Sequence, residues 1–286
     1  MNRLMKSFLR RFSPITLSLL TAAGVSLSGA RAQIVTLHDG NSSASVDLGS
    51  QAGMYQWLIN GQNQLSQQWF WYRVGNDASG QHSIDTIGGL THAENANTVD
   101  ATYTAPNFSI ELIYTLNGGA AGGSDWTSDI TENITINNLT GSTLDFHFYQ
   151  YSDFALAGSS GNEMATIFQN GGFYSRAKVV KFANQLSETI DQPLANEAEA
   201  DLATATRDRL NQGSPYTLNG VASAGPDPAL DATWALEWDF SIAANGSVDV
   251  IKDKKLSVAP IPEPGVLSLA VLGLAAFVLR RSRSCA

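Results

Sequence analysis

Hydrophobic and polar residues alternate along much of the chain between positions 33 and 257. The clearest stretch is 234–242, where tryptophan, leucine, phenylalanine and isoleucine fill every second position. A period of two is typical of antiparallel strands that have one buried face. The same alternation occurs in four other segments: 44–48, 99–104, 108–116 and 144–148.

Turn-forming pairs such as Asn60-Gly61 and Asn245-Gly246 separate these segments. About ten strands without helices between them predict an all-β fold. An antiparallel β-sandwich fits best, and a jelly-roll arrangement of its strands fits as well. One short helix is expected within 196–210, because Asn196 and Glu199 have the spacing of a capping box. No change in composition divides 33–257, so we expect one β-sandwich domain there.

Residues 1–32 have the three parts of a secretory signal peptide. Basic residues lie near the start, an apolar stretch covers 15–27, and the small residues Ala30 and Ala32 follow. We expect cleavage between Ala32 and Gln33. The secretory translocon and signal peptidase are therefore expected partners of the chain.

Residues 258–286 combine a short motif, an apolar segment and a basic cluster. The motif is Pro262, Glu263 and Pro264, the apolar segment is about 265–279, and the basic cluster is Arg280, Arg281 and Arg283. A helix over 265–279 would be about 22 Å long, shorter than a bilayer core of about 30 Å, which favours a transient anchor. This tail resembles the PEP-CTERM sorting signal of Gram-negative bacteria.

The resemblance implies a partner and a route. An exosortase-type membrane transpeptidase would recognise the proline–glutamate–proline motif, while the terminal arginines stay in the cytoplasm. The protein would be exported, anchored transiently in the inner membrane through a transmembrane helix, and sorted to the cell surface or the extracellular matrix. The middle section resembles uncharacterised exported proteins with the same tail, and that likeness implies no activity.

The charge of the middle section is strongly acidic. Nine basic and 25 acidic residues lie between positions 33 and 262. A surface of this sign repels phosphate backbones, so we expect no nucleic-acid partner. The single cysteine, Cys285, excludes an internal disulfide and a cysteine nucleophile in the middle section.

An aromatic run, Trp69, Phe70, Trp71 and Tyr72, is the first candidate binding site. Flat aromatic faces on an exposed strand could stack on sugar rings, so Trp69, Trp71 and Tyr72 are carbohydrate-binding candidates, with an extracellular polysaccharide as the partner. The alternative is a strand that is buried on both faces, since large aromatic residues dominate protein cores.

Asp125, Asp129 and Glu132 are the only candidates for a metal site, and calcium is the only cofactor considered. Their spacing fits no defined calcium loop, and a solvated turn is the alternative. The four histidines lack metal-ligand spacing. Strand carboxylates such as Glu237 and Asp239 could serve a hydrolase, and a polar outer face is their simpler role.

The chain contains no nucleophile elbow, no zinc-protease motif and no phosphate-binding loop. We therefore predict that the β domain is not an enzyme and that it belongs to a surface or extracellular-matrix protein sorted through its tail. A carbohydrate-binding module is the alternative, and a secreted hydrolase is the second alternative.

Overall fold

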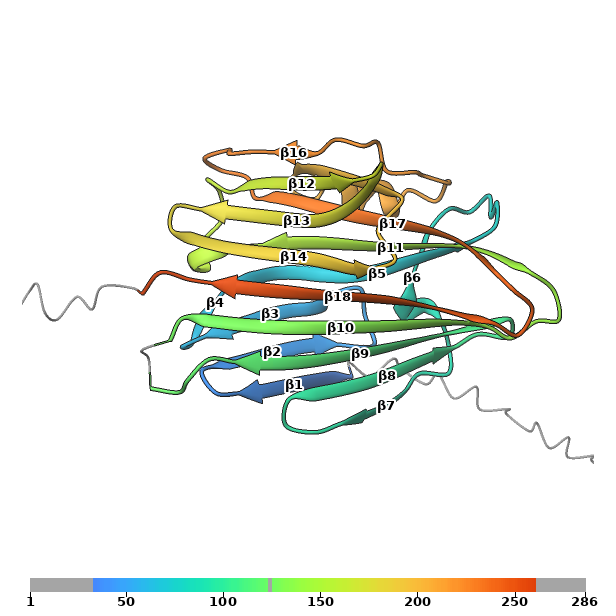
Figure 1. Cartoon of the computed structure of the whole chain (residues 1–286), viewed down its shortest axis with the longest axis horizontal. Coiled ribbons are helices and arrows are strands. Elements are labelled where there is room, and N and C mark those ends of the chain that lie inside the picture. Colours follow the sequence, from blue (N-terminus) through green and yellow to red (C-terminus); the bar gives the residue numbers. More distant parts are fainter. Residues whose placement is uncertain (1–32, 123–124, 261–286) are drawn as a thin grey trace, which may run out of the picture. The chain divides into compact units, whose positions relative to one another are not determined.

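The computed structural model describes residues 33–122 and 125–260. The predicted signal peptide and the sorting motif lie outside these residues. The described residues form two large, mostly antiparallel β-sheets that pack face to face around one core (Figure 1). The prediction of an all-β sandwich is confirmed.

The first sheet, sheet A, has seven strands in a continuous order and two short strands attached to it. The order is β1 (Ile34–Asp39), β2 (Ser42–Asp47), β3 (Gly53–Ile59), β5 (Leu65–Val74), β11 (Leu144–Phe154), β17 (Ala232–Ile242) and β15 (Glu197–Leu202). The attached strands are β4 (Gln62–Asn63) on β3 and β6 (His82–Ser83) on β5.

The second sheet, sheet B, has nine strands. Their order is β16 (Ser223–Ala224), β12 (Met164–Asn170), β13 (Phe173–Lys181), β14 (Asn184–Gln192), β18 (Ser247–Ser257), β10 (Thr127–Asn138), β9 (Phe108–Gly118), β8 (Thr98–Thr104) and β7 (Thr91–Glu94). All of its neighbouring strands are antiparallel.

The predicted helix is much shorter than expected. Residues 197–202 form strand β15, and only Ala205–Leu210 form the helix, α1. Pairing with β17, from Glu197 opposite Glu237 to Leu202 opposite Ala232, overrides the local capping pattern. Two single 3₁₀ turns, η1 (Ile84–Thr86) and η2 (Leu156–Gly158), lie in connections. Within the described residues, no helix has both the length and the apolar character that crossing a bilayer requires.

The core between the sheets contains charged groups as well as aromatic rings. Even-numbered residues of β10, β14 and β18 face inward, and four of them are ionisable and almost fully buried: Glu132, Glu188, Lys252 and Lys254. Each lysine forms ion pairs with both glutamates. Buried charges are tolerated when they are paired in this way.

The outer face of sheet A, which points away from sheet B, carries the odd-numbered residues of β11. Side chains of one strand alternate between the two faces of a sheet. Gln150 reaches Glu188 of sheet B, so His147, Tyr149 and Asp153 lie on the opposite, outer face. Connecting segments cover part of this face, because Trp71 donates its indole N–H to Asn211, just after α1.

Candidate functional site

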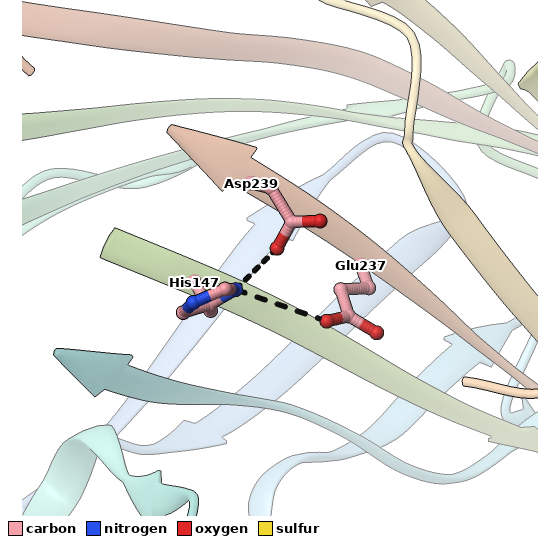
Figure 2. A group of neighbouring side chains, drawn as sticks. All are labelled: His147, Glu237 and Asp239. Atoms are coloured by element: carbon pink, nitrogen blue, oxygen red, sulfur yellow. Dashed lines mark hydrogen bonds and ion pairs between the residues drawn. The ribbon is translucent and has the colours of Figure 1, made fainter. Parts of the chain in front are cut away.

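Polar side chains from three neighbouring strands meet on the outer face of sheet A. Strand register places His147 of β11 opposite Asp239 of β17 and opposite Arg73 of β5. Two residues further along β11, Tyr149 lies opposite Glu237. Figure 2 shows the group formed by His147, Glu237 and Asp239.

His147 is fixed by a hydrogen bond between its Nδ1 atom and Oδ1 of Asp239. The other ring nitrogen, Nε2, lies 3.8 Å from Oδ1 of Asp145. The side chains of His147 and Asp239 are 16% and 39% exposed. When Nδ1 donates to Asp239, Nε2 of the neutral ring is left to accept a proton. A solvent-accessible base therefore results from the pairing of β11 with β17.

Glu237 lies beneath this pair and is 1% exposed. Its Oε2 atom accepts a hydrogen bond from Leu218 N at 2.9 Å. Its Oε1 atom lies 4.0 Å from His147 Nδ1 and has no hydrogen-bond partner among the described residues. Burial, with a smaller contribution from the charge of Asp239, raises the pKa of Glu237 to about 7 against the opposing effect of the Leu218 N–H. Glu237 can therefore hold or release a proton near neutral pH.

Buried polar groups surround Glu237. The hydroxyl of Tyr149 accepts hydrogen bonds from Arg73 Nη2 at 3.4 Å and Gln81 Nε2 at 3.2 Å. It lies 3.3 Å from the carbonyl oxygen of Tyr216, to which it donates. Within the described chain, Arg73 Nε and Gln81 Oε1 are buried without a partner. Each such atom costs about 1–3 kcal/mol, so their clustering beside a titrating carboxyl is typical of a ligand site.

The same group could hold a metal ion. His147, Glu237 and Asp239 each offer one ligand atom, and these atoms lie within 4.8 Å of one another. One nitrogen and two carboxylate oxygens suit a zinc-like ion better than calcium, which takes six to eight oxygens. The direct hydrogen bond between His147 and Asp239 also satisfies both groups without a metal.

A hollow lies further along the same face of sheet A. Its volume is about 400 Å³, and its lining includes Gln51, Tyr55, Gln67, Asp153 and Arg207. Asp153 in this hollow and His147 are six residues apart on β11, which corresponds to about 20 Å along the strand. Its walls hold a guanidinium, a carboxyl, a phenol and two amides, all of which can hydrogen-bond to sugar hydroxyls.

Asp153 in this hollow predicts a pH-dependent stability. Burial raises its pKa to about 7, and its Oδ1 atom has no partner within the described chain. Between about pH 4 and pH 7 the folded state keeps a proton that the unfolded state has lost, so the group destabilises the fold as the pH rises. Asp153→Asn should therefore stabilise the protein by about 2–4 kcal/mol at pH 8 and by much less at pH 4.

Urea unfolding of both proteins at the two pH values measures this difference. Asp208→Asn is a matched control, since the Asp208 side chain is 65% exposed. An equal effect of Asp153→Asn at pH 4 and pH 8 would show that the pKa of Asp153 does not change on folding, and would contradict the prediction.

The aromatic candidates from the sequence are buried. Trp69 and Trp71 are 0% exposed, and their indole N–H groups donate to Ser83 and Asn211. Tyr72 lies half-buried on the other face of β5, where its ring packs against Phe108. These rings therefore offer no free face to a sugar, and β5 is the strand buried on both faces that was the alternative.

The three acidic candidates for calcium do not come together. Asp129 and Glu132 are three residues apart on β10 and point to opposite faces of sheet B. Glu132 is buried between Lys252 and Lys254. Asp125 instead accepts hydrogen bonds from Thr127 before β10 begins. The three carboxyl groups therefore do not face one another in the described part of the chain.

Sequence reasoning missed His147, Arg73 and Gln81, and it interpreted Glu237 as part of a polar outer face. The available signal was a pair of polar residues two positions apart in each of two strands, at 145–147 and 237–239. That signal gains meaning only when the two strands are known to pair.

Comparison with known proteins finds similar folds but no similar sequences. No protein family matches the sequence, and no curated protein matches it either. A bacterial glucoamylase in complex with acarbose matches 85% of this chain with a TM-score of 0.55 and 9% identity, and this chain spans 34% of that one. A galactose mutarotase related enzyme from Lactobacillus acidophilus matches 80% of this chain and 99% of its own, with a TM-score of 0.51 and 7% identity. This chain shares its fold with sugar-processing enzymes.

The comparison corrects the prediction that the domain is not an enzyme. That prediction rested on the absence of short catalytic motifs. Both similar proteins are enzymes, and they share the fold at 9% and 7% sequence identity. A site assembled across paired strands, as on the outer face of sheet A, leaves no contiguous motif in the sequence.

Proposed function

We propose that the β domain is a carbohydrate-active enzyme that interconverts the two anomers of an aldose on the outer face of sheet A. The observation that carries the proposal is the contact of His147 with Asp239 above Glu237, a buried carboxyl whose pKa is about 7. The fold shared with a galactose mutarotase related enzyme supports it.

The reaction needs one base and one acid and no redox chemistry. His147 Nε2 accepts the proton of the hydroxyl at C1, and protonated Glu237 gives a proton to the ring oxygen. The bond between C1 and the ring oxygen breaks, and the open-chain aldehyde forms. Closure on the other face of the aldehyde returns both protons. Asp239 acts as a positioning residue that holds the histidine ring.

Anomer exchange fits the site better than glycoside hydrolysis does. Hydrolysis uses two free carboxyl groups on either side of the scissile bond. Here Asp239 is engaged by His147, so the group offers one free carboxyl instead of two. This chain also covers only 34% of the glucoamylase, whereas it covers 99% of the mutarotase related enzyme.

NMR exchange spectroscopy with the purified protein tests this function. A panel of aldohexoses and aldopentoses is equilibrated, and exchange between the α and β anomeric signals is measured with and without protein. We expect faster exchange for at least one sugar, unchanged by a chelator. Exchange at the buffer rate for every sugar would overturn the proposal, and loss of exchange with the chelator would assign the group to metal-assisted chemistry.

We also propose that the enzyme works outside the cytoplasm, on the basis of its two terminal segments. The first strand of the described residues begins at Ile34, so cleavage before Gln33 would leave each of the described strands intact. N-terminal sequencing of the exported protein should therefore begin at or near Gln33. Recovery of intact Met1 on exported protein would contradict this.

A further inference from the structure

The free positive charge of the described residues is concentrated in one place. Six of their nine basic side chains are buried or bonded to carboxylates or polar groups: Arg73, Lys181, Arg207, Arg209, Lys252 and Lys254. The other three, Arg176, Lys178 and Lys255, have no carboxylate within 4.0 Å among the described residues. All three line one hollow of about 430 Å³.

The hollow lies on the outer face of sheet B, across β13, β14 and β18. Strand register places Lys178 opposite Ser187 and Ser187 opposite Lys255, so the two lysines flank a serine at about 10 Å from each other. Arg176 lies at the same hollow with its guanidinium 4.1 Å from the centre of the Phe168 ring. Arg176 and Lys178 lie on β13 and Lys255 lies on β18, one strand beyond β14, and like charges at this spacing repel one another unless an anion lies between them.

We propose that this hollow, the basic groove, binds the carboxylate groups of an acidic polysaccharide. The groove is lined by these three cations and by hydroxyl and amide groups, from Thr127, Gln185, Ser187 and Ser257. Cations pair with the carboxylates of a uronic-acid chain, and the neutral groups hydrogen-bond to its hydroxyls. The groove is separate from the aldose site, because it lies on the outer face of the other sheet.

The surroundings of the groove favour a sugar polymer over a nucleic acid. Asp129 lies opposite Lys255 on β10, and Asp253 lies two residues before Lys255 on the same face. A nucleic-acid duplex carries one phosphate per about 1.7 Å of its axis and would bring several charges against these carboxylates beyond the groove. Phe168 is the one aromatic residue that lines the groove, and the Arg176 guanidinium lies over one face of its ring, where a base would otherwise stack.

Binding of polygalacturonate oligomers, measured by calorimetry at 50 mM and 300 mM NaCl, tests the proposal. We expect binding at 50 mM that weakens at least tenfold at 300 mM, since exposed charge pairs are screened by salt. The triple variant Arg176→Gln, Lys178→Gln, Lys255→Gln should lose at least tenfold in affinity at 50 mM. Neutral dextran of equal length should bind at least tenfold more weakly than polygalacturonate.

A second triple variant controls for net charge. Asn95→Asp, Gln212→Glu and Asn245→Asp change the charge by the same amount at exposed positions outside the groove. This variant should keep its affinity within about threefold. The proposal is overturned if both variants lose affinity equally, if dextran binds as tightly, or if single-stranded DNA of equal charge binds as tightly. Because aldose exchange should persist in the groove variant, failure here leaves the proposed function standing.

Discussion

His147→Asn should slow anomer exchange by a factor of about 10² to 10⁴, the usual contribution of a positioned general base. Asparagine can still donate to Asp239, so the strands around position 147 keep their contacts, whereas the amide cannot accept a proton from the sugar. The rate is measured by NMR exchange with the best aldose of the panel. The loss should appear in kcat rather than in thermal stability.

His92→Asn is the matched control. His92 lies on β7, where its side chain contacts Gln33 at 2.8 Å and is exposed. This variant should exchange anomers at the wild-type rate within about twofold. A His147→Asn protein that keeps more than a tenth of the activity would show that another residue is the base.

Glu188→Ala should lower the free energy of unfolding by about 3–5 kcal/mol. Glu188 is 0% exposed, and its Oε1 atom lies 3.4 Å from Lys252 Nζ and 3.2 Å from Lys254 Nζ. It also accepts hydrogen bonds from Gln150 and from the indole of Trp234. Alanine would leave two buried ammonium groups with one remaining carboxylate.

Urea denaturation measures this loss. Glu111→Ala is the control, since Glu111 lies on the outer face of sheet B at a half-buried position, and it should change the free energy by less than about 0.5 kcal/mol. A loss below about 1 kcal/mol for Glu188→Ala would show that the lysines lose their protons without cost when the carboxylate is removed.

Much of the sheet structure could be predicted because one face of most strands is buried. In β9 and β10 buried and less buried positions alternate, so the alternation in the sequence corresponds directly to the two faces of the sheet. The segment 196–202 was predicted wrongly, because a capping pattern is local and pairing with β17 is not. β5 carries large side chains on both faces, and no periodicity distinguishes a buried aromatic strand from an exposed platform.

The candidate site could not be predicted, because its residues are distant in sequence. His147 and Asp239 are 92 positions apart, and their contact depends on which strands are neighbours. The shifted pKa of Glu237 comes from its burial, and the backbone group that bonds to it, Leu218 N, lies in a connection without apolar periodicity. The buried charges could not be predicted either. Glu132 lies at an inward-facing position of β10, but its sequence context suggested an exposed ligand for calcium.

The pH dependence of kcat/KM for anomer exchange tests the central claim most directly. Protonated Glu237 is the acid, so kcat/KM of the wild-type protein should fall above about pH 7, where Glu237 loses its proton. Glu237→Gln should have a much lower rate that no longer falls between pH 7 and pH 9. If the variant keeps the wild-type rate, or keeps the same fall above pH 7, Glu237 is not the acid and the proposed site is wrong.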